Sequence, residues 1–157
     1  HPYSNSTIVA VFKSEEGGTL ISHAHTRLSV LKGENEGHRL FYSSAFHTAQ
    51  NEPKWVQIVS TSQPALSARP AVCAMVHGGA EKGETALYVN SVRDDDARAI
   101  PYHNTNADHG HVGAARLQRD FWSGDMAEII VYGRALSDAE RETIEEYLAG
   151  KYGVELE

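Results

Sequence analysis

The sequence predicts an all-β protein that ends in a single helix. Short runs rich in Val, Ile, Tyr, Phe and Trp follow one another between residues 7 and 90, and stretches that contain Gly separate them. No helical pattern intervenes, so antiparallel sandwiches or barrels are favoured over parallel βαβ units. The block at residues 137–150 has, by contrast, the period and the end signals of a helix.

The expected strands are bounded by turn-forming residues. They span residues 7–12, 19–22, 27–31, 39–44, 55–60, 71–77 and 85–90. The stretch EEGG at residues 15–18 is assigned to a turn between two of them. The runs TIVAVF (7–12) and AVCAMV (71–76) are apolar at consecutive positions, which predicts that both faces of these strands are covered, one of them by an element such as the terminal helix.

The helix is the best-defined local element. Ser137 and Glu140 have the spacing of a capping box, in which each side chain accepts a hydrogen bond from the backbone of the other residue. Gly150 or Gly153 is expected to end the helix. The apolar stripe through which it would dock consists of Ile144, Tyr147, Leu148 and Lys151.

Size and composition are those of one globular domain. A chain of 157 residues, 41% of them hydrophobic, is most simply a single domain over residues 1–157. The formal net charge of −7 argues against nucleic acid as a partner. No apolar run approaches the roughly 20 residues that cross a bilayer, so no membrane insertion is expected. The single Cys73 is expected to pack as a small apolar group.

The most specific pattern lies between residues 124 and 153. A strand with the order Gly-Asp-hydrophobic-Ala-Glu ends in Tyr, Gly-Arg-Ala-Leu-Ser-Asp-Ala-Glu-Arg follows, and the helix ends Tyr-Leu-Ala-Gly-Lys-Tyr-Gly. This ending resembles the C-terminal end of laminin-G-like domains of the concanavalin A-like lectin/glucanase superfamily. The residues that carry the resemblance are Gly124, Asp125, Ala127, Glu128, Tyr132, Arg134, Ala135, Leu136, Ser137 and Glu140. Upstream, TIVAVFK resembles the early core strand, and ALYVNS resembles the Leu-Tyr-Val-Asn-Gly hairpin with Ser91 in place of Gly.

The resemblance implies a two-sheet antiparallel jelly-roll sandwich with one short C-terminal helix, about residues 137–150, packed outside. Because members of the family generally carry an extra N-terminal portion, the single domain is expected to be either a fragment of such a domain or an unusually short one. Members of the family are mostly non-catalytic domains of secreted and surface proteins of bacteria, and they bind carbohydrate or protein, some of them through calcium. An extracellular or cell-surface location, and neighbouring domains of a longer chain as partners, follow as expectations.

The irregular segment between residues 93 and 121 is the predicted ligand site, because a long polar loop in a compact domain is commonly functional. The expected ligand-contacting residues are Asp94, Asp95, Asp96, Tyr102, His103, Asn104 and Asn106. Oxygen donors of this kind, together with Asp108, suit calcium, whereas the alternative is an acidic turn in solvent.

A second candidate metal site consists of Asp108, His109 and His111. Two imidazoles one residue apart lie on the same face of an extended chain and suit a transition metal such as zinc. His23 and His25 repeat this spacing. The simpler interpretation is that these are solvated loop histidines, because a chain with nine His contains such pairs by chance.

Glu128 lies inside an apolar run and has two interpretations. As a catalytic carboxylate it would need a second acidic residue beside the scissile bond. The Glu-x-Asp-x-x-Glu arrangement of related hydrolases is absent, and Asp125 is expected on the opposite face of the strand. We favour a structural carboxylate that accepts hydrogen bonds from Arg134 or from backbone N–H groups.

These observations favour a non-catalytic binding module for carbohydrate. The alternative is a structural or protein-interaction domain of a larger multidomain protein, and a glycoside hydrolase or lyase ranks third.

Overall fold

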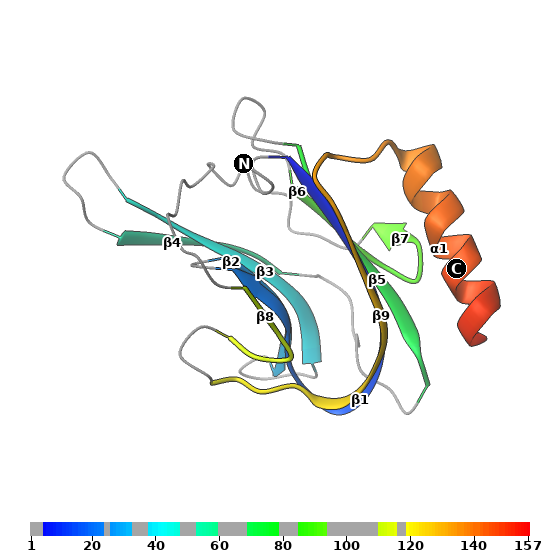
Figure 1. Cartoon of the computed structure of the whole chain (residues 1–157), viewed down its shortest axis with the longest axis horizontal. Coiled ribbons are helices and arrows are strands. Elements are labelled where there is room, and N and C mark those ends of the chain that lie inside the picture. Colours follow the sequence, from blue (N-terminus) through cyan, green and yellow to red (C-terminus); the bar gives the residue numbers. More distant parts are fainter. Residues whose placement is uncertain are drawn as a thin grey trace.

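The computed structural model describes residues 5–23, 26–32, 38–47, 53–59, 69–78, 85–93, 110–115 and 119–157. Strands make up most of these ranges and one helix follows them (Figure 1). The strands are β1 (Ser6–His23), β2 (Thr26–Lys32), β3 (His38–His47), β4 (Pro53–Val59), β5 (Ala71–His77), β6 (Thr85–Val89), β7 (Val92–Arg93), β8 (Gly110–Val112) and β9 (Ser123–Tyr132), and the helix is α1 (Asp138–Tyr152).

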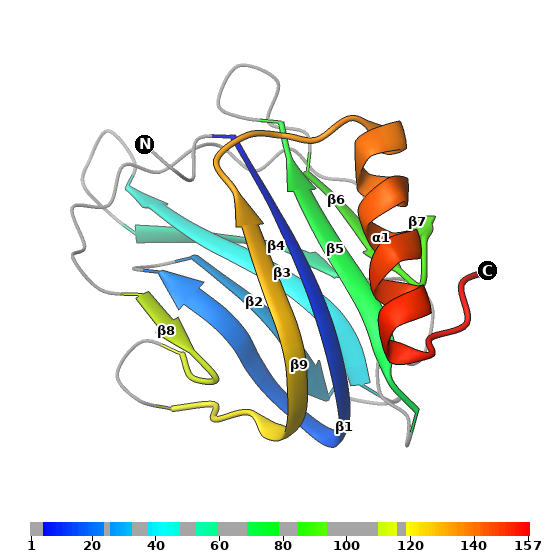
Figure 2. The ribbon, with the colours of Figure 1, turned by 45° about the vertical axis from the view of Figure 1, so that its right-hand side comes forward.

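The described strands form one curled antiparallel sheet around the long strand β1. The sheet runs in the order β4-β3-β2-β1-β5-β6-β7, and β8 and β9 also pair with β1. The first part of β1 pairs with β5 and β9, whereas its last part, from Gly18 onward, pairs with β2 and β8. The bend between these parts turns β2, β3 and β4 back over the other strands, so that β6 contacts β3 and β4 (Figures 1 and 2).

Residues 15–18, which the sequence assigned to a turn between two strands, form this bend inside β1. Gly17 and Gly18 have φ angles of 81° and 128°, which residues with a Cβ rarely adopt. β9 follows β1 into the bend, with Ser123 opposite Gly17. The prediction was wrong because two consecutive Gly residues let a strand change direction without ending, although their composition is that of a turn.

Both faces of the central strands are covered, as their uninterrupted apolar runs predicted. The cluster inside the curl contains Ile8, Ala10, Phe12, Leu20, Leu28, Val30, Leu40, Tyr42, Ala71, Cys73, Met75 and Leu87. The cluster beneath α1 contains Val9, Val11, Val72, Ala74, Tyr88, Leu148, Ala149 and Val154. Alternate residues of β1 and β5 therefore face the inner core and the helix. Burial raises the pKa of the Cys73 thiol, which packs as an apolar group.

The helix has the predicted N-terminal cap. The Oγ of Ser137 accepts a hydrogen bond from the backbone N–H of Glu140, and the Glu140 carboxylate accepts one from the backbone N–H of Ser137 at 3.0 Å. Of the two predicted stops, Gly153 is the correct one: it adopts the left-handed conformation with φ 68°, and the helix therefore extends to Tyr152 rather than to residue 150.

The helix docks through part of the predicted stripe and through two charged residues outside it. Leu148 is buried, and Ile144 packs against the same cluster. Tyr147, expected to pack inward, is 61% exposed. Arg141 and Glu145 are buried instead, and they form an ion pair four positions apart. The Arg141 guanidinium lies 3.8 Å from the ring centroid of Tyr88, and the Ser91 hydroxyl donates to Glu145 at 2.9 Å. The prediction missed Arg141 and Glu145 because counting apolar positions does not detect two charges that neutralise each other against a sheet.

The predicted class, all-β with one C-terminal helix, is confirmed. Because the described strands belong to a single curled sheet, the finer assignment to a two-sheet jelly roll stays a prediction, as does the extent of the domain. The helix α1 of the described chain is too short and too polar to span a membrane.

Candidate functional site

The predicted ligand-contacting residues, Asp94, Asp95, Asp96, Tyr102, His103, Asn104 and Asn106, lie outside the residues that the structure describes. The ends of their segment are defined. β7 ends at Arg93, and β8 begins at Gly110 and pairs with the last part of β1. The role of the segment 94–109 in binding stays a prediction.

The predicted metal site is only partly described. Asp108 and His109 lie outside the described residues, whereas His111 lies on β8 opposite Ser22 of β1. Within the described ranges, no three His, Cys, Asp or Glu side chains come together in a way that would hold a metal ion.

Glu128 is held by two donors, neither of which is Arg134. Its Oε2 accepts hydrogen bonds from the Lys151 Nζ at 2.8 Å and from the Tyr152 hydroxyl at 2.9 Å. These two bonds, Lys151 first, lower the pKa of Glu128. Arg134 binds Glu140 instead, at 2.8 and 2.7 Å, because it lies beyond the end of β9 next to the start of the helix. Since a general acid needs a raised pKa, this environment does not favour that role for Glu128.

A bulge in β9 changes the predicted relation between Asp125 and Glu128. The register shifts by one residue between them: Glu128 lies opposite Val11, and Asp125 lies opposite Lys13. Because Val11 and Lys13 are two positions apart on β1, they share a face, and so do the two carboxylates. The expectation of opposite faces was wrong because an extra residue in a strand reverses the alternation beyond it.

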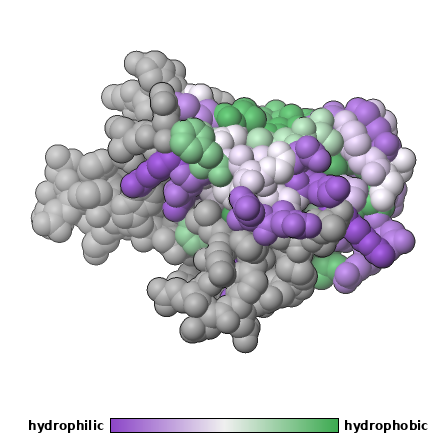
Figure 3. Space-filling view, turned by 90° about the horizontal axis from the view of Figure 1, so that it is seen from below, coloured by the Kyte–Doolittle hydropathy of each residue, from purple (hydrophilic) through white to green (hydrophobic). Residues whose placement is uncertain are grey.

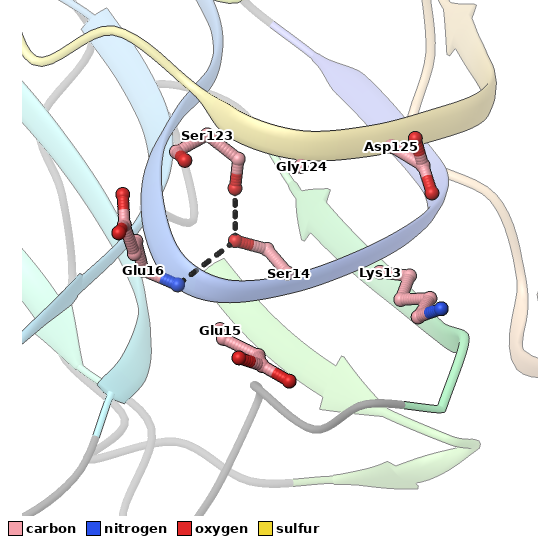
Figure 4. A pocket seen from close by; sticks show the side chains of 7 residues that line it. All are labelled: Lys13, Ser14, Glu15, Glu16, Ser123, Gly124 and Asp125. Carbon is pink, nitrogen blue, oxygen red and sulfur yellow. Dashed lines mark hydrogen bonds between the residues drawn. The ribbon is translucent and has the colours of Figure 1, made fainter.

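An open polar groove lies where β1 bends alongside β9 (Figure 4). Its cavity volume is about 270 Å³. The groove is lined by Lys13, Ser14, Glu15, Glu16, Ser123, Gly124 and Asp125. Lys13 and Asp125, opposite each other in the register, lie at one end, and Glu16 and Ser123 lie at the other (Figure 4).

The floor of the groove is built around the buried hydroxyl of Ser14. Its Oγ accepts hydrogen bonds from the backbone N–H groups of Gly17 at 2.8 Å and Glu16 at 3.2 Å, and it donates to the Ser123 carbonyl. Gly124 lets β9 approach closely: a Cβ there would lie 2.4 Å from the Lys13 carbonyl oxygen. The shape of the groove is therefore set by backbone contacts, which hold it without a ligand.

The walls of the groove carry an excess of negative charge. Three exposed carboxylates, those of Glu15, Glu16 and Asp125, stand against the single ammonium of Lys13. Charged residues thus line an open depression. Figure 3 shows the molecule from below, and on this face hydrophilic residues lie next to hydrophobic ones.

Sequence reasoning missed this groove, because its residues come from the presumed turn at 15–18 and from a motif interpreted as framework. The sequence did contain a signal for it. Three charged residues, Lys13, Glu15 and Glu16, come between an apolar strand and the pair Gly17-Gly18. The pairing of that stretch with Ser123 and Asp125 depends on the bend and was not predictable from local sequence.

A larger hollow, of about 500 Å³, lies beside the C-terminal end of α1. Three of its polar side chains make contacts within the chain. The Asn90 Oδ1 accepts from the Val72 backbone N–H at 3.1 Å, and Arg69 lies 3.9 Å from Glu155. The groove at the bend, with carboxylates directed to solvent, is therefore the better candidate for a ligand site.

No protein-family model matches the sequence, and no curated protein matches it. Solved structures match over nearly the whole chain. Domain 4 of AbnA, an extracellular GH43 arabinanase from Geobacillus stearothermophilus, in complex with arabinotriose, matches with a TM-score of 0.60 and 14% identity, covering 90% of this chain and 66% of that chain.

Toxin binding domains match as well. The binding domain of Paraclostridial Mosquitocidal Protein 1 has a TM-score of 0.64 and 13% identity, covering 94% of this chain and 38% of that chain. The binding domain of botulinum neurotoxin DC, in complex with SialylT, has a TM-score of 0.60 and 11% identity, covering 93% and 36%.

The matched structures are β-rich domains that belong to larger proteins or are much longer than this chain. The chain spans 66% of the arabinanase domain and 36% to 38% of the two toxin domains. At such low identity the likeness shows the fold alone. Membership of the laminin-G-like group stays a prediction.

Proposed function

We propose that this chain is a non-catalytic carbohydrate-binding module, and that the groove at the bend of β1 is part of its ligand site. The observation that carries the proposal is the fold, which the chain shares with an arabinanase domain in complex with arabinotriose and with toxin binding domains. Several of these domains serve binding within larger proteins, and the proposal assigns the same kind of role to this chain.

The chemistry of the groove supports this role. Sugars present hydroxyl groups that both donate and accept hydrogen bonds, so a site for them needs polar groups that fix the ligand's orientation. The carboxylates of Glu15, Glu16 and Asp125 accept from hydroxyls, and the Lys13 ammonium donates to them. An open depression suits a chain that continues past the site in both directions.

The finer expectations belong to the same proposal. We assign the chain to the laminin-G-like group, with a two-sheet jelly roll and an extracellular or cell-surface location. The residues proposed for calcium are Asp94, Asp95, Asp96, Asn104, Asn106 and Asp108. A rise in the melting temperature on adding calcium, reversed by EDTA, supports this assignment, and an unchanged melting temperature contradicts it.

Isothermal titration calorimetry tests the function directly. The panel comprises the neutral sugars arabinotriose, xylotriose, cellotriose and mannotriose and the acidic sugars sialyllactose and trigalacturonate, each with calcium and with EDTA. We expect binding of at least one neutral sugar, weakened in the double variant Glu15→Gln, Glu16→Gln. Absence of heat with every sugar in both buffers contradicts the proposal.

An interaction domain is the second candidate, and the free side of β9 favours it. Among the described strands β9 pairs with β1 alone, and Val131 near its end is 43% exposed. Such an edge offers unpaired backbone groups to another strand. A concentration-dependent dimer in light scattering, abolished by Val131→Lys, supports this function, and a monomer at all concentrations argues against it.

A further inference from the structure

Phe121 exposes an apolar ring at the end of the groove. It is 63% exposed, although it carries no polar atom that gains from contact with water. Its neighbour Trp122 does the opposite, since its ring packs edge-on against Phe12 in the core with 5.2 Å between centroids. Because Trp122 packs against the core and successive side chains of an extended chain point to opposite sides, the Phe121 ring is directed outward.

The backbone around Phe121 is held from several sides. The Asp120 carbonyl accepts from the Thr19 N–H at 2.9 Å, and the Trp122 N–H donates to the Gly113 carbonyl at 2.9 Å. Asp120 adopts a positive φ of 50°, a conformation that is uncommon for residues other than Gly. These bonds therefore hold the backbone from which the exposed Phe121 ring projects.

Two further contacts hold this backbone, one against the bend of β1 and one against β2. A Cβ on Gly18 would lie 2.3 Å from the Phe121 carbonyl oxygen, so the two backbones touch. The Asp120 carboxylate accepts from Arg27 of β2 at 2.6 Å. These contacts fix the backbone on both sides of Phe121, so the direction in which its side chain leaves the backbone is fixed as well.

The backbone of Phe121 adjoins the groove. Phe121 lies two positions before Ser123, which lines the groove and is paired with Gly17, and Gly17 follows Glu16. Ser123 and Phe121 are both exposed, whereas Trp122 between them turns to the core. The exposed ring of Phe121 therefore belongs to the chain two positions before the end of the groove that Ser123 and Glu16 line (Figure 4).

We propose that Phe121 is a stacking platform for a neutral sugar ring whose hydroxyl groups bind the adjoining groove. A sugar ring has an apolar face of C–H groups and a rim of hydroxyls, and this surface offers an aromatic face beside carboxylates in the same order. Neutral sugars fit better than acidic ones, because three carboxylates against one ammonium repel an anionic ligand. This inference rests on the proposed function and adds the specificity residue to it.

Calorimetry with arabinotriose, xylotriose, cellotriose and mannotriose compares the unaltered chain with Phe121→Ala, Phe121→Tyr and Tyr147→Ala. Tyr147 is the matched control, since it is an aromatic residue on α1 with nearly the same exposure, 61% against 63%. Loss of a stacked ring should weaken binding at least about tenfold in Phe121→Ala, whereas Phe121→Tyr keeps most of the affinity. Tyr147→Ala should leave it unchanged.

Melting temperatures separate binding from folding. Because the Phe121 ring is exposed, Phe121→Ala should melt within a few degrees of the unaltered chain. A neutral sugar that binds Phe121→Ala and the unaltered chain equally overturns this inference and leaves the proposed function intact. Absence of binding by the unaltered chain overturns both. Equal losses in Phe121→Ala and Tyr147→Ala also contradict a specific role for Phe121.

Discussion

At the scale of single residues, backbone freedom at two adjacent Gly residues decides the path of the central strand. Gly17 and Gly18 have positive φ angles, and the backbone at Phe121 lies against Gly18 at a distance that excludes any side chain. Gly124 plays the same role from the opposite strand, against the Lys13 carbonyl. Three positions without side chains thus permit β1 and β9 to bend together and enclose the groove.

Replacing Gly18 should therefore be costly. Gly18→Ala is expected to lower the free energy of unfolding by about 1–3 kcal/mol, because it combines a disfavoured φ of 128° with a backbone clash. Gly133→Ala is the control, since a Cβ there meets nothing within 4 Å, and it should change stability by less than about 1 kcal/mol. Urea denaturation of both variants measures the difference, and equal stabilities contradict the role assigned to Gly18.

The buried ion pair makes a second residue-scale prediction. Glu145→Ala leaves the Arg141 guanidinium, 3% exposed, without its buried partner and should cost about 3–5 kcal/mol. Glu142→Ala removes an exposed partner of the same guanidinium and should cost less than about 1 kcal/mol. Chemical denaturation at neutral pH distinguishes the two. Similar losses show that burial is not what makes Glu145 important.

At the scale of elements, α1 combines a predictable start with an unpredictable docking face. Its capping box is local, since Ser137 and Glu140 satisfy each other's backbone groups. Its packing is not local, because Glu145 accepts from Ser91 of the turn between β6 and β7, and Arg141 lies over Tyr88 of β6. The helix therefore carries carboxylates in two contrasting environments, one in solvent and one in the interface.

These environments shift the two pKa values in opposite directions. Arg134 and Ser137 lower the pKa of Glu140 to about 2, whereas burial raises the pKa of Glu145 above its ordinary value. Glu140 stabilises the fold above the unfolded-state pKa of about 4.3, and that contribution is lost as the pH falls toward 2. The contribution of Glu145 is present at low pH and is lost as the pH rises through its folded-state pKa.

The prediction for Glu140 follows from this sign. Glu140→Gln should be less stable than the unaltered chain at pH 7, and the difference should shrink as the pH falls from about 5 toward 2. Glu146→Gln, an exposed change on the same helix, serves as the control for the loss of one charge. Thermal unfolding over this pH range gives the comparison, and a difference that stays constant with pH contradicts the coupling to Arg134.

At the scale of the whole molecule, the sheet curls around one core and exposes its bend. The inner cluster joins residues from both parts of β1 and from β2, β3, β5 and β6, and the helix covers the outer face of β1 and β5. With both faces covered, the edges and the bend are left for ligands, and the groove lies at the bend. The chain as a whole carries a formal net charge of −7, which any ligand meets on approach.

That charge predicts how salt acts on binding. Affinity for a neutral sugar should change less than about twofold between 50 and 500 mM NaCl, because screening acts only between charges. Trigalacturonate, which is anionic, should bind more weakly than any neutral trisaccharide at low salt, and the gap should narrow at high salt. Calorimetry at both salt concentrations tests this. Tight binding of trigalacturonate at low salt contradicts the electrostatic account of the groove.

Much of the fold was predictable because its signals are local. Consecutive apolar residues in TIVAVF and AVCAMV predicted two covered faces, and the inner and outer clusters divide these strands accordingly. The candidate site was not predictable in the same way. The groove combines residues 13–16 with residues 123–125, and only the pairing of β1 with β9 brings them together.

The all-β class, the positions of most strands and the start of the helix follow from the sequence, because they depend on periodicity and on groups a few residues apart. The tertiary structure alone decided that β1 is one bent strand, that a bulge places Asp125 and Glu128 on the same face, and that Arg141 and Glu145 are buried. The physical reason is that bends, bulges and buried charges depend on partners more than a hundred residues away in some cases, such as Ser14 and Ser123, whose separation is 109 residues. Partners so distant in sequence cannot be inferred from the local pattern of apolar and polar residues.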